Sequence, residues 1–348
     1  MATKTAKELH QVIQRILTTA GADRENAELV AEHLVRANLS GVDTHGAWHV
    51  GGYVGAIKDG SIVPTAKPEI IKDEGNYALV SGNWTFGQVT AKFAMEHAIE
   101  AAKSHKMALV GVVQTHHIGR LGHYPEMAAR AGMISMVWAG GYGEIAPATV
   151  PYGGRKPLLH TNPISMGFPA AEGTPVMFDF ATTPISGVKV NNAKRRGESL
   201  PPGCIVDKDG RDSTNPNDFF EGGSHKPFGG HKGYALMMAA EYLGRIFTGS
   251  SSYADEKRAG PIMRHQGCTM MVMKADLFQS REAYQKSAEE MQERAHAIPP
   301  APGFDEVLMP GDPEARTRAT RERDGIPIED AIWQQIVECA AELGIKDV

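Results

Sequence analysis

The sequence has few cysteines, no long apolar run and no excess of basic residues. Its three cysteines are isolated, so it contains neither a CxxC pair nor the even cysteine set of a small disulfide-stapled domain. No stretch approaches the roughly 18 to 20 consecutive apolar residues that a membrane-spanning helix needs. The net charge of −5, with 36 scattered Lys and Arg residues, disfavours binding to nucleic acid or to an anionic membrane. We therefore expect a cytoplasmic protein whose partner is a small molecule.

Two phosphate-binding motifs are also missing. No G-x-G-x-x-G lies between a predicted strand and a predicted helix, and there is no Walker A motif. A dinucleotide, if this chain binds one, is therefore held by an architecture other than a Rossmann domain.

Hydrophobic periodicity predicts helices at the N-terminus and an α/β arrangement after them. Apolar residues recur at helical spacing over 5–20 and 23–39, which predicts two antiparallel helices joined at Gly21. From about residue 68, β-branched runs alternate with helical ones. The predicted strands are 78–82, 107–114, 133–140, 175–182 and 269–278, and the predicted helices are 87–105, 123–131, 231–247 and a charged tail from about 315. The hydrophobic content of 42% supports a substantial core.

A histidine-rich loop, 114-QTHHIGRLGHY-124, follows one of these strands, where ligands are usually met in layered α/β folds. Adjacent residues at a strand end point to opposite faces, so His116 and His117 rarely chelate one ion. We predict no metal site. Two interpretations of this loop remain: it carries a catalytic histidine, or it is a polar loop in which one imidazole is hydrogen-bonded within the protein.

A second cluster, 43-DTHGAWHVGGY-53, lies just past the second helix. It carries His45, His49 and Tyr53, and an imidazole with a pKa near 6.5 can accept and return a proton at physiological pH. The hydroxyl of Thr44 can orient His45. The sequence Asp-Thr-His-Gly is also typical of a turn, so the residues alone are equally compatible with a structural role.

Two further segments carry residues that are suited to catalysis or ligand binding. Asp179 interrupts an apolar strand, and a buried carboxylate costs several kcal/mol unless it is paired, so we expect a partner, most obviously a histidine. The glycine-rich loop 226–230 opens a helix at His231 and Lys232, where backbone N–H groups and a lysine suit a phosphate. An ordinary glycine-rich helix start is the alternative.

In this order, the segments resemble the malate/L-lactate dehydrogenase family, which lacks a Rossmann fold and includes ureidoglycolate, sulfolactate and diketogulonate oxidoreductases. The likeness covers nearly the whole chain, and HHIGRLG is most similar to the 2-hydroxycarboxylate dehydrogenase branch. The motifs that carry it are THG, HHIGRLGHY, YGGRKPLLHTNP, DFATTPISGVK, LPPG-x-x-x-D-x-DG, GGHKGYAL and PGDPE.

The resemblance implies an α/β fold of this non-Rossmann, malate/L-lactate dehydrogenase-like type, usually a homodimer. It implies a large central NAD(P)-binding domain at 71–304. A helical part for substrate binding and dimerisation is expected from 1–70 and 305–348. The cofactor is NAD or NADP, and the choice between them stays open.

The resemblance also implies roles for individual residues. His45 matches the proton donor or acceptor, His117 is its rival for that role, and Asp179 matches an aspartate near the nicotinamide. The implied substrate contacts are Thr44, His49, Tyr53 and Arg120. The implied cofactor contacts are His45, Arg120, Leu121, Gly122, Gly141, Asp179, Phe180, Ala181, Thr182, Thr183, His231, Lys232, Gly311, Asp312 and Pro313.

One departure from the family concerns the substrate carboxylate. Many members carry an arginine where this chain has His49, so the candidate anchors are Arg120, His49 and Lys156. Trp48 also changes the pocket, which is compatible with a substrate bulkier than malate, and Thr44 replaces the more usual serine but keeps the hydroxyl.

The expected reaction is hydride transfer between C4 of a nicotinamide and C2 of a 2-hydroxy or 2-keto acid. A first alternative is reduction of a cyclic imine carboxylic acid on the same fold. A second is a non-catalytic scaffold with a decayed site.

Overall fold

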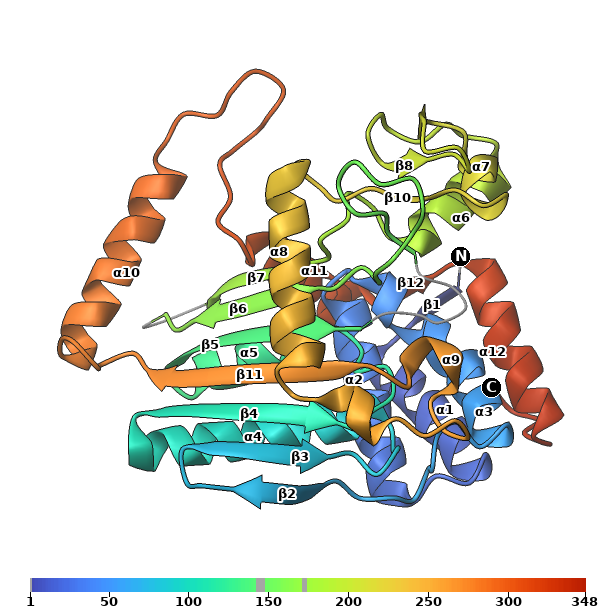
Figure 1. Ribbon diagram of the computed structural model, residues 1–348, viewed down its shortest axis with the longest axis horizontal. Coiled ribbons are helices and arrows are strands. Elements are labelled where there is room, and N and C mark those ends of the chain that lie inside the picture. The colour runs from blue at the N-terminus through green and yellow to red at the C-terminus, as the bar shows by residue number, and fades with distance from the viewer. Residues whose placement is uncertain (1, 142–147, 171–173) are drawn as a thin grey trace.

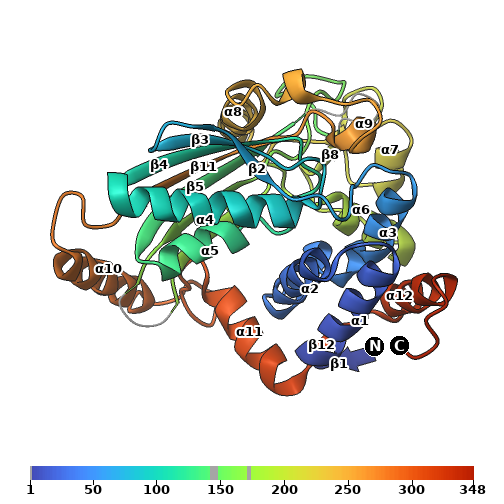
Figure 2. The ribbon, with the colours of Figure 1, turned by 90° about the horizontal axis from the view of Figure 1, so that it is seen from below.

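The computed structural model describes residues 2–141, 148–170 and 174–348. It is a mixed α/β structure in which helices cover both faces of a central sheet (Figure 1). Helices from the two ends of the chain gather together beside that sheet (Figure 2).

The central sheet brings together strands from most of the chain. Among the described residues its order is β2-β3-β4-β11-β5-β6-β7, and of its strand pairs only β3 and β4 run parallel. The strands are β2 (Glu69–Asp73), β3 (Tyr77–Ser81), β4 (Met107–Val113), β5 (Met133–Gly140), β6 (Ile164–Phe168), β7 (Val176–Phe180) and β11 (Gly267–Lys274). Of the strands of this sheet, β11 comes last in the sequence, yet it lies at the centre of the sheet between β4 and β5.

Helices pack on both faces of this sheet (Figure 2). The helices are α4 (Gly87–His105) and α5 (His123–Arg130) on one face, and α8 (His231–Glu241) on the other. Buried apolar side chains from α4, α5 and the strands form one core, which includes Met95, Val110, Tyr124 and Met270. The predicted helix 231–247 is α-helical only to Glu241 and continues as a π-helical segment, Tyr242–Ile246.

A second core joins the two ends of the chain. The elements that surround it are β1 (Ala2–Lys4), α1 (Ala6–Thr19), α2 (Arg24–Leu39), α3 (Val50–Lys58), β12 (Ile326–Ile328) and α12 (Asp330–Glu342). Helix α11 (Asp312–Asp324) packs beside α2 and buries none of its residues. Strand β1 pairs antiparallel with β12, and Leu9 and Ile13 of α1 share a buried cluster with Ile336 of α12. The tail therefore packs back on the first helices, as predicted.

Local sequence signals explain where the first helices begin. Thr5 forms a capping box with Glu8 at the start of α1, and the Asp23 side chain accepts the backbone N–H of Asn26 at the start of α2. Gly41 follows α2 with φ +76°, a left-handed conformation that suits glycine. The chain then turns sharply into the His45 segment.

The remaining elements lie around these two cores. They are α6 (Gly187–Arg196), β8 (Ile205–Val206), β9 (Asp212–Ser213), α7 (Pro216–Phe220), β10 (Ser224–His225), α9 (Gly260–Met263) and α10 (Arg281–His296). Helix α10 projects from the body of the molecule (Figure 1), and none of its residues is buried. Among the described residues, no helix is both long enough and apolar enough to cross a membrane. The domain division at residues 70/71 and 304/305 stays a prediction.

Candidate active site

The segment that carries His45 is held on both sides by polar side chains. It consists of two short 3-10 turns, Asp43–His45 and Ala47–His49. Asn38 of α2 donates to the Asp43 carboxylate at 2.6 Å and accepts the backbone N–H of Ala47 at 2.8 Å. Arg321 of α11 donates to both oxygens of Asp43, at 2.6 and 3.0 Å. The position of His45 is therefore fixed by helices from opposite ends of the chain.

Three predicted histidines form one partly buried imidazole cluster. The ring centre of His117 lies 5.8 Å from that of His45 and 4.5 Å from that of His49. The Thr44 hydroxyl lies 3.1 Å from Nδ1 of His45, and Nε2 of His49 donates to the Thr44 carbonyl at 3.0 Å.

All three imidazoles of this cluster are neutral at pH 7. Burial, helped by the charge of Arg120, lowers the pKa of His45 to about 4. Burial and the nearby His45 lower the pKa of His49 to about 4, and burial holds the pKa of His117 well below its usual value. Each ring therefore has one protonated and one unprotonated nitrogen.

A chain of hydrogen bonds sets the tautomer of His117. The side-chain amide of Gln88 donates to the Tyr53 hydroxyl oxygen at 2.5 Å, and that hydroxyl lies 2.8 Å from Nδ1 of His117. Because an amide N–H only donates, the Tyr53 proton points to Nδ1, and Nε2 of His117 carries the ring proton. Burial raises the pKa of Tyr53, so the phenol stays protonated. Sequence analysis missed Gln88, which lies in a helix with no motif around it.

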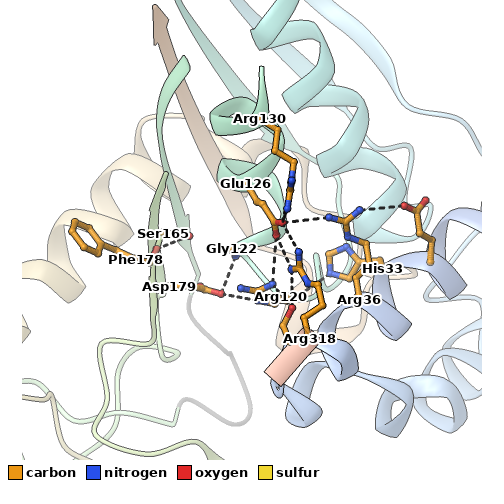
Figure 3. Close-up of polar contacts among 12 residues, drawn as sticks. His33, Arg36, Arg120, Gly122, Glu126, Arg130, Ser165, Phe178, Asp179 and Arg318 are labelled. Atoms are coloured by element: carbon orange, nitrogen blue, oxygen red, sulfur yellow. Dashed lines mark hydrogen bonds and ion pairs between the residues drawn. The ribbon is translucent and has the colours of Figure 1, made fainter. Parts of the chain in front are cut away.

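Asp179 has partners, but they are not a histidine (Figure 3). Its carboxylate accepts the backbone N–H of Gly122 at 2.9 Å and lies 3.5 Å from Nε of Arg120. The expected histidine partner was therefore wrong: the Arg120 loop provides both a charge and a backbone donor. Burial raises the pKa of Asp179, while Arg120 and Gly122 act in the opposite direction.

A histidine that sequence analysis missed supports this loop. Nε2 of His33 on α2 accepts the backbone N–H of Arg120 at 2.9 Å. Gly119 has φ +75°, and a Cβ there would lie 2.3 Å from Nε2 of His33. Only glycine fits, which explains one glycine of the HHIGRLG motif.

Four arginines surround the buried carboxylate of Glu126 on α5 (Figure 3). Arg318 and Arg130 lie within 2.8 and 2.7 Å of it, and Arg36 and Arg120 within 3.5 and 3.9 Å. Burial raises the pKa of this carboxyl, but the hydrogen bonds and charges of the arginines outweigh it, so the pKa lies well below its usual range. In the sequence, the only indication of this arginine cluster is the spacing of four residues between Glu126 and Arg130, and such spacing is common on exposed helices.

The predicted site residues line separate cavities. One, of about 220 Å³, is lined by His45, His117, Leu121 and Gly141. A second, of about 210 Å³, is lined by Arg120 and Gly311, among others. A third, of about 580 Å³, is lined by the glycine loop that precedes α8. The first cavity unites the two candidate proton-transfer residues with part of the predicted cofactor set.

Several predicted cofactor residues are engaged within the protein. Thr182 donates its hydroxyl to the Thr161 carbonyl at 2.7 Å, and Thr183 donates to the Ile185 carbonyl at 3.1 Å. Asp312 accepts from His296 at 2.7 Å. Phe180 packs edge-on against Phe228, with ring centres 5.8 Å apart. Of the remaining residues in the prediction, Ala181 is half-buried beside Thr182, Pro313 lies in the first turn of α11, and the candidate anchor Lys156 is exposed.

The start of α8 fits a phosphate group. Gly230 precedes it, no side chain caps it, and His231 and Lys232 form its first turn. A Cβ built on Gly229 would meet no atom within 4 Å. Unpaired backbone N–H groups beside a lysine are suited to a pyrophosphate.

In the described part of the chain, no group of three or more His, Cys, Asp or Glu residues could hold a metal ion.

Comparisons with known proteins agree with one another. The model of the malate/L-lactate dehydrogenase family matches residues 5–337. The chain is 33% identical over 347 residues to hydroxycarboxylate dehydrogenase B of Escherichia coli O157:H7. The aligned region covers 98% of this chain and 94% of that protein.

Two solved structures share the whole fold. Sulfolactate dehydrogenase from Methanocaldococcus jannaschii has a TM-score of 0.89 and 31% identity, over 99% of this chain and 98% of that one. Δ1-piperideine-2-carboxylate reductase from Pseudomonas syringae pv. tomato has a TM-score of 0.86 and 30% identity, over 98% of this chain and 100% of that one.

Proposed function

The chain belongs to the malate/L-lactate dehydrogenase family, and from this membership and the site geometry we propose that it is an NAD(P)-dependent 2-hydroxyacid dehydrogenase. It interconverts a 2-hydroxy acid and the corresponding 2-keto acid. The observation that carries the proposal is that His45 and His117 line one cavity with Leu121 and Gly141.

The nicotinamide, when bound, supplies the hydride acceptor or donor. We assign its contacts to the predicted set, with the pyrophosphate at the start of α8, where Lys232 and free backbone N–H groups offer positive charge. Asp179 and Gly122 lie beside Arg120 and complete the cofactor-side wall.

The chain itself must hold the substrate and move one proton. His45 is the acid/base in this proposal: its neutral ring accepts the hydroxyl proton in oxidation and returns it in reduction. His117 presents its Nε2–H to the same oxygen and stabilises negative charge there. It is also the rival for the role of proton donor.

A screen of 2-hydroxy acids with NAD and with NADP tests this function. We expect turnover with at least one pair, and a loss of about 100-fold or more in kcat for His45→Ala with cofactor binding retained, as general acid–base catalysis typically contributes 10²–10⁴-fold. Normal turnover by His45→Ala would refute the assignment to His45. Failure of the wild-type protein to bind either cofactor by fluorescence titration would refute the function and favour a non-catalytic scaffold.

Reduction of a cyclic imine carboxylic acid is the second candidate, favoured by the structural similarity to the piperideine-2-carboxylate reductase. Assays of Δ1-piperideine-2-carboxylate and of 2-keto acids in the reductive direction, with NADH and with NADPH, separate the two. A kcat/KM for the imine above that for every keto acid would favour this second function.

We also propose that the enzyme is a homodimer. Helix α10 buries none of its residues, and large apolar side chains are exposed on and around it: Phe278 is 99% exposed, Phe304 71% and Met291 58%. Exposed apolar groups of this size favour association.

A further inference from the structure

A cavity of about 400 Å³ adjoins the imidazole cluster on the side of Trp48. It lies between α6, α12 and the start of α3. His49 belongs to both places: its ring lines this cavity, and its centre lies 4.5 Å from the ring centre of His117. The cavity therefore begins one side chain away from the proposed reaction centre.

The polar side of this cavity includes four side chains that have no partner among the described residues. Asn191, Asn192 and Arg195 come from α6, and Gln335 comes from α12. Their side chains make no hydrogen bond or ion pair with any described residue. Glu329 also lines the cavity, and its carboxylate lies 3.7 Å from the guanidinium group of Arg196. The cavity therefore has one arginine with no partner among the described residues, and three amides that can donate to an oxygen-rich group.

The opposite side is apolar and open. Trp48, which is 40% exposed, lines the cavity together with Val188 and Ile332. Gly51 and Gly52 of α3 line it too, and a Cβ built on either would meet no atom within 4 Å. Glycine destabilises a helix relative to alanine, and none of the described residues lies close enough to require it here. The missing side chains leave room for a ligand.

We propose that this cavity is a specificity subsite that receives the distal end of the substrate, a carboxylate-bearing tail of a 2-hydroxy acid longer than lactate. Arg195 binds the terminal carboxylate, the amides of α6 and α12 donate to its oxygens, and Trp48 packs against the methylene groups. This inference rests on the proposed function of the neighbouring site.

The charge distribution supports this choice of ligand. His45, His49 and His117 are neutral at pH 7, so they attract a carboxylate only weakly. Arg120 already lies 3.0 Å from the Ser40 hydroxyl and 3.5 Å from Asp179. Arg195 is the cation of the cavity that has no other partner among the described residues.

Steady-state kinetics with a short and a long substrate test the subsite. The ratio of kcat/KM for 2-hydroxyglutarate to that for lactate should fall about tenfold or more in Arg195→Met, mainly through KM, because a charge-assisted hydrogen bond is lost. Gly52→Leu should lower the same ratio by filling the cavity, and its added side chain meets open space, so it should fold. Arg294→Met, on exposed α10, is the matched control and should leave the ratio unchanged. An unchanged ratio in both test variants overturns the proposal.

Calorimetric titration with glutarate separates this inference from the proposed function. The wild-type protein should bind glutarate, and Arg195→Met should bind it at least about tenfold more weakly, even if no hydroxy acid is oxidised. Absence of turnover with wild-type binding of glutarate would refute the dehydrogenase and support the subsite. Equal affinity in both proteins, or no binding by the wild type, would refute the subsite.

Discussion

At the scale of single residues, one hydrogen-bond chain sets which nitrogen of His117 carries the ring proton. Gln88 donates to Tyr53, and Tyr53 donates to Nδ1 of His117, so the ring presents Nε2–H. Neither Gln88 nor Tyr53 needs to touch the substrate to have this effect. We regard Gln88 as a positioning residue.

Removal of the Tyr53 hydroxyl should release this control. In Tyr53→Phe, we expect His117 to populate the Nδ1–H tautomer and kcat to fall about 10-fold or more, within the range typical of groups that orient a catalytic imidazole. Two-bond ¹H–¹⁵N NMR spectra of histidine-labelled protein report the tautomer directly. Tyr77→Phe, at an exposed strand position, is the matched control. A His117 signal that is identical in wild type and Tyr53→Phe would contradict the assignment.

At the scale of secondary-structure elements, Glu126 joins three helices. Its carboxylate on α5 contacts Arg36 of α2 and Arg318 of α11, and Arg120 of the adjoining loop lies 3.9 Å away. Arg318 also donates to Ser40 at 3.0 Å, at the end of α2. The cluster therefore fixes the C-terminal α11 against the central helices and next to Arg120.

Glu126→Ala should lower the free energy of unfolding by about 3–5 kcal/mol, because it leaves buried guanidinium groups without their shared anion. Urea unfolding measures the loss, and Glu290→Ala on exposed α10 should change stability by less than about 0.5 kcal/mol. A loss below about 1 kcal/mol in Glu126→Ala would contradict a stabilising role for the cluster.

The Glu126 contribution also has a defined pH dependence. The folded-state pKa of Glu126 lies below the unfolded value of about 4.3, so its stabilising contribution is present above that pH and is lost as the pH falls toward the folded pKa. The stability difference between wild type and Glu126→Ala should therefore shrink as the pH falls below about 4.3.

At the scale of the whole molecule, α10 projects from the body of the chain (Figure 1). It buries none of its residues, and Phe278, Met291 and Phe304 on and around it are exposed. Light scattering should give a mass twice the 37.5 kDa of the chain, and Met291→Asp should shift the protein toward the monomer. A single-chain mass for the wild type at micromolar concentration would contradict the homodimer.

The sequence by itself determined most elements and the family. Local signals suffice for this: capping residues set helix starts at Thr5 and Asp23, and apolar periodicity marks α1, α2 and α4. The motifs around His45 and His117 also predicted two residues that line one cavity of the structure. These features depend on residues close together in the chain, which is why they are readable before folding.

Only the tertiary structure decided which side chains and strands that are distant in the sequence contact one another. Asp179 meets Arg120 rather than a histidine, and Arg318 reaches Glu126 across 192 positions of sequence. The central place of β11 and the cavity beside His49 likewise arise only when distant segments pack together. Local pattern carries no information about such partners, because burial and long-range charge pairing are set by how the two cores and their helices meet.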